Sequence, residues 1–112
     1  NLYAISDAIS ACGMPDGKYD FANVKIEKKN GRAVVNDNTL AGSIVTMLDT
    51  FKNLTRINFS LQQAVAMTSY HAAQYLNEND KGKIDKGFCA NLLILDKQFD
   101  IKAVYLYGDL VR

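Results

Sequence analysis

The sequence predicts an α+β fold, in which strands and helices occupy separate stretches of the chain. Three patterns indicate it. Apolar and polar side chains alternate over residues 18–35 and again over 101–107, which is typical of half-buried antiparallel strands. Between them, apolar side chains recur every three or four residues over 44–76, which is typical of helices. The 112 residues, of which 48% are hydrophobic, can bury a core without disulfides or a metal.

The first predicted element is a short strand at Leu2–Ile5. Its residues are all apolar, which is typical of a strand covered on both faces in a parallel sheet, and it ends at the polar pair Ser6–Asp7. A turn-rich loop follows over 13–17, which contains two glycines and the proline. Asn30–Gly31 then predicts a type I′ hairpin turn, since both residues tolerate positive φ.

Two helices are predicted in the middle of the chain. One face of the first carries Ile44, Met47, Leu48, Phe51, Leu54 and Ile57. Asn58 is expected to end this helix, and Ser60 with Gln63 has the spacing of a capping box that starts the second. The buried stripe of the second helix is predicted to comprise Leu61, Ala64, Val65, Thr68, Ala72, Tyr75 and Leu76.

The last third of the chain is predicted to return to β-structure. A polar loop over 77–83 separates it from the helices. Residues 92–95 form an apolar strand and residues 101–107 an alternating one, with a final turn at Gly108–Asp109.

Composition and charge narrow the classes of function. The net charge of +1 argues against a nucleic-acid surface, and no apolar run approaches the roughly 20 residues of a membrane span. Cys12 and Cys89 are too few for a disulfide scaffold and fit a reducing compartment, so a cytoplasmic location is expected. The chain begins without Met and directly on a strand pattern, so it is expected to be a piece of a longer protein.

Two segments are candidates for chemistry. Asp7 follows an apolar strand, the place where catalytic groups lie in parallel barrels, and its carboxylate could be a general base or a metal ligand; alternatively it caps a turn. Thr39–Ser43 is a small-residue segment expected to open the first helix, where free backbone N–H groups would suit a phosphate. The alternative is that Thr39 or Ser43 simply caps that helix.

Other polar groups are expected to be structural. His71 is the only histidine, and one imidazole with two scattered thiols does not make a metal site or a supported cysteine–histidine pair. A solvated sheet edge that deters strand addition is expected from Lys25, Lys28, Lys29 and Arg32.

Taken in order, several motifs resemble those of the N-acetylglucosamine-6-phosphate deacetylases, a family of the amidohydrolase superfamily. They are Ser6–Ala8 with Gly13, Thr39–Ser43 with Thr46–Met47, Asn53–Leu54, the helix over 60–69, and the Gly82–Asp96 run with Val104, Gly108 and Val111. The last run is shared by many amidohydrolases. Two departures are Asn38, where the family commonly has Gly, and Tyr70–Ala72 in place of Asn-Pro, so the second helix is expected to continue.

The resemblance implies that this α+β chain is the last strand and helices of a (β/α)8 barrel plus the C-terminal half of a flanking β-sandwich. Residues 1–16 would be barrel strand eight with the catalytic loop, 17–37 a β-hairpin, 38–80 barrel-type helices, and 81–112 the C-terminal sandwich strands. The Glu and two His that bind the metal in the family would lie upstream, outside this chain.

The resemblance also implies a reaction, the hydrolysis of N-acetylglucosamine 6-phosphate to glucosamine 6-phosphate and acetate. Asp7 would act as base and then acid, and Leu40, Ala41 and Gly42 would contact the substrate through their backbone. A divalent metal of the zinc or iron type is expected in the full-length enzyme and none on this chain. Alone, the chain is expected to be inactive and to self-associate or pair with the missing N-terminal part, with no nucleic-acid or membrane partner.

Two alternatives stay open. The chain could be a non-catalytic α+β module that binds a sugar or a protein, or it could belong to an amidohydrolase with a different amide substrate. Binding of the sugar phosphate without a metal would favour the first, and the upstream sequence would decide the second.

Overall fold

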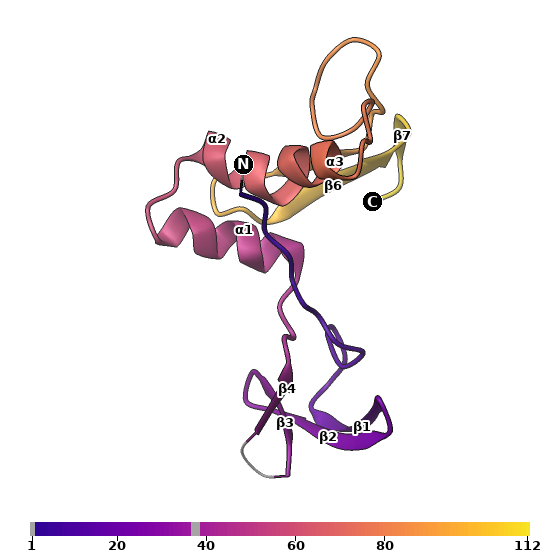
Figure 1. Ribbon diagram of the computed structural model, residues 1–112. Helices are drawn as coiled ribbons and strands as arrows, with labels where there is room; N and C mark the ends of the chain where they lie inside the picture. Colours follow the sequence, from indigo (N-terminus) through magenta and orange to yellow (C-terminus); the bar gives the residue numbers. More distant parts are fainter. Residues whose placement is uncertain (1, 37–38) are drawn as a thin grey trace. The chain divides into compact units, whose positions relative to one another are not determined.

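The structure is a computed structural model that describes residues 2–36 and 39–112 (Figure 1). Asn38, one of the two departures noted above, lies outside the described residues. The chain divides into two compact units, one made of Ile5–Leu54 and the other of Thr55–Arg112 with the residues up to Ala4. Each unit contains an antiparallel sheet and helical residues, which confirms the predicted α+β class.

The sheet of the Ile5–Leu54 unit is a four-stranded meander. Its strands are β1 (Gly17–Phe21), β2 (Val24–Lys29), β3 (Arg32–Val35) and β4 (Thr39–Gly42), paired in chain order. The predicted turn is confirmed, since Asn30 and Gly31 have φ of 52° and 72°, the signs that a type I′ turn requires. Ile26 and Ala33 are each 1% exposed and form the centre of this sheet's buried face.

The basic residues of the meander do not form a sheet edge, so that prediction is wrong. They are Lys25, Lys28, Lys29 and Arg32. β2 pairs with β1 on one side and β3 on the other, so its lysines lie on an internal strand. Lys25 forms an ion pair of 2.6 Å with Asp20, its cross-strand partner in the register, and Lys28 Nζ donates to the Met14 carbonyl. The alternating pattern predicted the hairpin of β2 and β3, and β1 and β4 pair with it on either side.

The first helix starts later than predicted. Thr39–Gly42 is strand β4, in which Leu40 pairs with Val34, and helix α1 (Met47–Arg56) follows. Thr46 caps this helix, because its hydroxyl accepts the Asp49 N–H at 3.1 Å and the Asp49 carboxylate accepts the Thr46 N–H at 2.8 Å. Thr39–Ser43 therefore does not form the N-terminus of a helix, and neither Thr39 nor Ser43 caps α1.

The end of α1 is as predicted. Phe51 and Leu54 are each 9% exposed, so the apolar face is buried at its centre. Asn58 has a φ of 70° and its N–H donates to the Thr55 carbonyl at 3.2 Å, so the chain leaves the helix in the left-handed conformation that Asn tolerates.

The second helical stretch is continuous but not uniform. It consists of α2 (Leu61–Val65), a π-helical turn η1 (Ala66–Tyr70) and α3 (His71–Tyr75), so the helix continues through Tyr70–Ala72 as expected. The capping box is confirmed: Ser60 Oγ accepts the Gln63 N–H at 3.2 Å and Gln63 Oε1 accepts the Ser60 N–H at 2.9 Å. The π-turn has no counterpart in the predicted pattern.

The stripe predicted for this helix is only partly buried. Ala64 is fully buried and Met67, which the stripe omitted, is 7% exposed. Half or more of the residue surface is exposed at Leu61, Val65, Tyr75 and Leu76. An apolar stripe is buried only where another element packs on it, and the packed surface is centred on Ala64 and Met67 instead.

Removing the Ser60 hydroxyl is expected to lower the free energy of unfolding. In the full-length protein, Ser60→Ala leaves the Gln63 N–H without its cap, at a cost of about 1 kcal/mol. Urea unfolding measures the change, and Ser69→Ala, an exposed serine on the same helical stretch, is the control. Equal stability of the two variants would contradict the capping role.

The second sheet belongs to the other unit. It contains β5 (Leu92–Leu95), β6 (Ile101–Leu106) and β7 (Asp109–Leu110), antiparallel in chain order, which confirms the two predicted strands. The Asp96 carboxylate holds the turn between β5 and β6, accepting the N–H groups of Asp100 and Gln98 at 2.9 Å each. Those bonds and Lys102 at 3.0 Å lower the pKa of Asp96.

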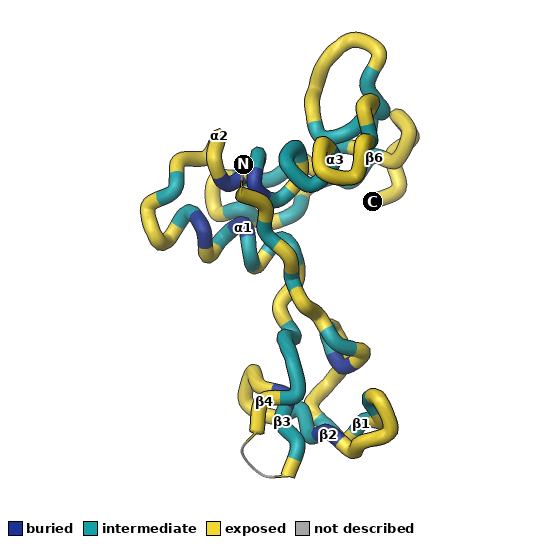
Figure 2. Tube along the Cα trace, viewed as in Figure 1, coloured by how far each residue is buried: buried dark blue, intermediate teal, exposed yellow. Residues whose placement is uncertain are grey.

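The predicted strand at Leu2–Ile5 is not a strand in this structure. Leu2 and Ile5 are 63% and 71% exposed despite their apolar side chains. Figure 2 draws this N-terminal stretch of the tube in the colours of exposed and intermediate residues. A strand of a parallel sheet needs neighbouring strands for its backbone groups, and no described strand pairs with these residues.

Across the described ranges, no helix is both long and apolar enough to cross a membrane.

Candidate active site

The structure brings together Asp7 and the end of β4, the two segments that the sequence singled out separately. The Ser43 N–H donates to the Asp7 carbonyl at 3.2 Å, and the Ile9 N–H donates to the Ser43 carbonyl at 2.9 Å. These bonds form an isolated parallel bridge between Ala8 and Ser43. Asp7 is thus held by the residue that follows Gly42, and both lie in the Ile5–Leu54 unit.

Gly42 permits this close approach. Its φ is 148°, a conformation that L side chains rarely adopt. A Cβ at this position would overlap Ile9 Cγ2 and would lie 3.9 Å from the Asp7 carbonyl oxygen. Any side chain at Gly42 would therefore push against the loop that carries Asp7.

The Asp7 side chain is exposed to solvent. The residue is exposed and has a φ of 50°, in the left-handed region that Asp tolerates better than most residues. Within residues 2–36 and 39–112, no group donates a hydrogen bond to its carboxylate. The turn is capped instead by Ser6, whose hydroxyl accepts the Ala8 N–H at 3.3 Å. The alternative of a turn-capping aspartate therefore does not hold for these residues.

Leu40, Ala41 and Gly42 lie on β4, not at a helix N-terminus. The prediction that this segment offers free N–H groups at the N-terminus of the first helix is therefore wrong, because α1 begins at Met47. β4 is the last strand of the described sheet and pairs on one side only, with β3. Backbone groups on the unpaired edge of such a strand are open to a ligand, and Leu40 is 69% exposed.

The loop after Asp7 is fixed by contacts that the sequence did not indicate. Ala11 is fully buried within it. The Cys12 thiol donates to the Ile44 carbonyl at 3.3 Å, and the Asp16 carboxylate accepts the Asn30 N–H at 3.2 Å. Their partners are far along the chain, so no local spacing could have revealed them. They tie the loop to the segment after β4 and to the hairpin turn.

The described residues do not make a metal centre. No group of three or more His, Cys, Asp or Glu side chains gathers anywhere in those ranges. His71 Nδ1 lies 2.6 Å from the Leu2 carbonyl oxygen. The Cys89 thiol donates to the Asp80 carboxylate at 3.1 Å, and this bond raises the pKa of the thiol and keeps it protonated. The described His71 and Cys89 side chains are thus each engaged in a hydrogen bond of their own.

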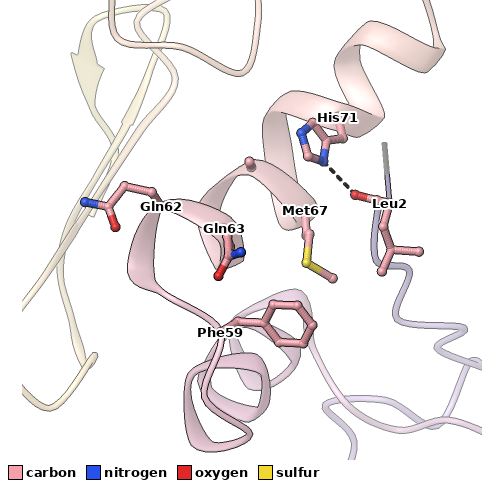
Figure 3. A pocket seen from close by; sticks show the side chains of 7 residues that line it. Leu2, Phe59, Gln62, Gln63, Met67 and His71 are labelled. Atoms are coloured by element: carbon pink, nitrogen blue, oxygen red, sulfur yellow. Dashed lines mark hydrogen bonds between the residues drawn. The ribbon is translucent and has the colours of Figure 1, made fainter.

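A hollow of about 420 Å³ lies in the other unit, beside the helices (Figure 3). Phe59, Met67 and Leu2 point into it. His71 lies at its rim, where its ring nitrogen Nδ1 is hydrogen-bonded to the Leu2 carbonyl. The lining is largely apolar, and His71 is its one titratable group. It offers no carboxylate for acid–base chemistry.

Comparison with known proteins gives a consistent family. Residues 19–111 match the model of the amidohydrolase family. The chain is 38% identical over 97 residues to the N-acetylglucosamine-6-phosphate deacetylase of Lysinibacillus sphaericus, covering 86% of this chain and 25% of the relative. It is 34% identical over 109 residues to the deacetylase of Vibrio furnissii, covering 96% of this chain and 27% of the relative.

Solved structures agree with these relatives. The crystal structure of N-acetylglucosamine-6-phosphate deacetylase from Thermotoga maritima superposes with a TM-score of 0.91 at 28% identity, covering 99% of this chain and 31% of that one. An Asp-to-Ala mutant of the Mycobacterium smegmatis deacetylase, in complex with N-acetyl-D-glucosamine-6-phosphate, superposes with a TM-score of 0.84 at 28% identity, covering 98% of this chain and 30% of that one. The chain therefore spans between a quarter and a third of the length of these relatives.

Proposed function

Because the chain belongs to the amidohydrolase family, we propose that it forms the C-terminal part of a hydrolase that deacetylates N-acetylglucosamine 6-phosphate. The observation that carries the proposal is the exposed Asp7 carboxylate, held by its backbone against the end of β4. Support also comes from the deacetylases of Lysinibacillus sphaericus and Vibrio furnissii, which match this chain over most of its length.

The proposed chemistry uses Asp7 twice. Its carboxylate accepts a proton from water as the water oxygen adds to the acetamide carbonyl carbon. The same proton then passes to the amine nitrogen as the C–N bond breaks, which releases acetate and glucosamine 6-phosphate and returns Asp7 to its charged form. An exposed carboxylate with no competing donor among the described residues suits both steps.

The backbone of Leu40, Ala41 and Gly42 is proposed to contact the substrate. Their strand leaves one edge unpaired within the described sheet, and the bridge at Ser43 keeps that strand beside Asp7. Backbone N–H groups there can donate to hydroxyl or carbonyl oxygens without carrying a charge. A net charge of +1 on the chain fits recognition by such local groups.

Membership of the amidohydrolase family implies a divalent metal in the full-length enzyme. Because the described residues hold no ligand cluster, we place its ligands outside this chain and assign none of the steps above to it.

The finer architecture is likewise a proposal: residues 1–16 as barrel strand eight and its loop, and 81–112 as sandwich strands. Between them, Thr39–Gly42 belongs with the β-portion that precedes the helices. The two free thiols suit a cytoplasmic enzyme.

The test is an assay of two proteins. The full-length protein, supplied with a divalent metal, is expected to release acetate and glucosamine 6-phosphate from N-acetylglucosamine 6-phosphate. The isolated 112-residue chain is expected to release none and, because apolar residues such as Ile5 and Ile84 are 71% and 90% exposed, to elute above its mass of 12.4 kDa.

Other outcomes would contradict parts of the proposal. Hydrolysis of another amide but not this sugar would assign a different substrate within the family. Tight binding of the sugar phosphate by the isolated chain, with no turnover by the full-length protein, would indicate a binding module. Turnover by the isolated chain would overturn the assignment of its metal ligands to residues outside it.

A further inference from the structure

The backbone at Asp7 takes a conformation that needs support from its neighbours. Its φ of 50° lies in the left-handed region, which an Asp side chain tolerates but does not favour. Such a conformation persists only where surrounding contacts hold it. Because rotation about φ turns the Cα–Cβ bond relative to the preceding peptide, these contacts also decide where the carboxylate projects.

Ser43 fixes one edge of the backbone around this turn. Its N–H donates to the Asp7 carbonyl at 3.2 Å, and its carbonyl accepts the Ile9 N–H at 2.9 Å. A residue that bonds in this way to both neighbours of its parallel partner leaves the partner's own N–H pointing to the opposite edge. The partner here is Ala8, so the Ala8 N–H faces away from Ser43.

The Ser6 hydroxyl meets that N–H on the opposite edge. Ser6 Oγ accepts the Ala8 N–H at 3.3 Å, in a local bond that spans Asp7. A serine side chain can reach the N–H two residues later only when the residue between them turns the chain. The hydroxyl and the left-handed φ of Asp7 therefore support each other. Ser6 is half-buried, and all three residues belong to the Ile5–Leu54 unit.

The loop that follows is held by bonds that do not involve Ser6. The Ile9 carbonyl accepts the Cys12 N–H at 2.9 Å, and the Cys12 thiol donates to the Ile44 carbonyl at 3.3 Å. Loss of the Ser6 hydroxyl is therefore expected to leave this loop in place and to free only the peptide units on either side of Asp7.

We propose that Ser6 is a positioning residue for Asp7. Its hydroxyl holds the Ala8 N–H and so keeps Asp7 in the left-handed conformation from which its carboxylate meets the substrate. The inference rests on the function proposed above, because it affects the rate only if Asp7 acts on the substrate. Misplacement of a catalytic group by about 1 Å can cost roughly a hundredfold in rate. The Ser43 bonds remain when the hydroxyl is lost, so a smaller loss is expected.

The test compares three variants of the full-length protein. Ser6→Ala removes the hydroxyl, whereas Ser6→Thr keeps an acceptor oxygen on Cβ. Ser10→Ala is the matched control, because it removes an exposed hydroxyl of the same loop that lies 3.5 Å from the Asp20 carbonyl. Ser6→Ala is expected to lower kcat about tenfold with KM nearly unchanged, since the proposed substrate contacts on β4 stay in place. Ser6→Thr is expected to keep most of the activity and Ser10→Ala all of it.

Hydrogen–deuterium exchange gives a second readout, which does not depend on activity. The Ala8 N–H loses its acceptor in Ser6→Ala, so deuterium uptake by the peptide that contains Ala8 is expected to accelerate severalfold at millisecond labelling times. Uptake in Ser6→Thr and Ser10→Ala is expected to match that of the unmodified protein. All measurements are made well below the melting temperature of each variant, so that the folded fraction is the same.

Three results overturn the positioning role: an unchanged kcat in Ser6→Ala, equal losses in Ser6→Ala and Ser6→Thr, or a comparable loss in Ser10→Ala. Unchanged uptake at Ala8 in Ser6→Ala overturns the restraint itself. If the unmodified protein fails to deacetylate, the proposed function is wrong, and the uptake at Ala8 still decides whether the Ser6 hydroxyl holds the turn.

Discussion

Replacing Asp7 with Asn in the full-length protein is expected to lower kcat for deacetylation about a thousandfold, with KM changed little. The amide has nearly the same shape as the carboxylate but cannot take a proton from water at neutral pH. The fold is expected to survive, because the carboxylate accepts no hydrogen bond from the described residues and the bridge to Ser43 uses the Asp7 backbone. Steady-state kinetics with measured metal content and melting temperature checks both expectations.

Asp20→Asn is the control for the change in charge. Asp20 lies in the same unit and forms a solvent-exposed ion pair with Lys25, so its loss removes the same charge without touching the site. Its kcat should equal that of the unmodified protein. If Asp7→Asn turned over normally, or if both variants lost activity equally, Asp7 would not be the base.

Gly42→Ala is expected to cost both stability and activity. The residue's φ of 148° is unfavourable for any L side chain, and the new Cβ would overlap Ile9 Cγ2. Backbone strain and overpacking together predict a loss of about 3 kcal/mol in the free energy of unfolding. Because Ile9 is bonded through its N–H to Ser43, relief of the clash moves the loop that bears Asp7, and kcat falls as well.

Two further variants separate the causes of that loss. Gly13→Ala, in the same loop, also imposes a side chain at positive φ (76°), but its Cβ would have no neighbour within 4 Å, so only the backbone cost of about 1 kcal/mol is expected. The double variant Ile9→Ala with Gly42→Ala removes the clashing methyl and should recover part of the lost stability. Equal losses in the two single glycine variants, or no recovery in the double variant, would contradict the packing explanation.

Sequence analysis identified the elements whose cause is local. The turn at Asn30–Gly31 and the capping box at Ser60 depend on residues within a few positions of each other, and both are present. Thr39–Gly42 was misassigned because its strand character comes from pairing with β3, which no local pattern reveals. The π-turn was not predicted for a similar reason: helical propensity does not indicate whether a backbone N–H donates to the carbonyl four or five residues earlier.

The candidate site shows the same division. Asp7 was identified by its place after an apolar run, and Leu40, Ala41 and Gly42 by their likeness to a family motif. That Asp7 lies beside Gly42 was not predictable from spacing, since the contact depends on the path of an entire sheet between them. The supporting bonds of Cys12 and Asp16 likewise involve partners that are remote in the sequence.

The bridge at Ala8 and Ser43 has a consequence for how such proteins can diversify. The chain leaves this point at Ile9, forms the whole meander, and returns to it at Ser43 through bonds of 2.9 and 3.2 Å. A chain segment whose two ends are held together can be lengthened, shortened or replaced at small entropic cost. The reason is that the entropy of closing a loop depends only weakly on its length. Insertions and deletions are therefore expected to accumulate in the hairpins of the meander, while the two ends keep their spacing.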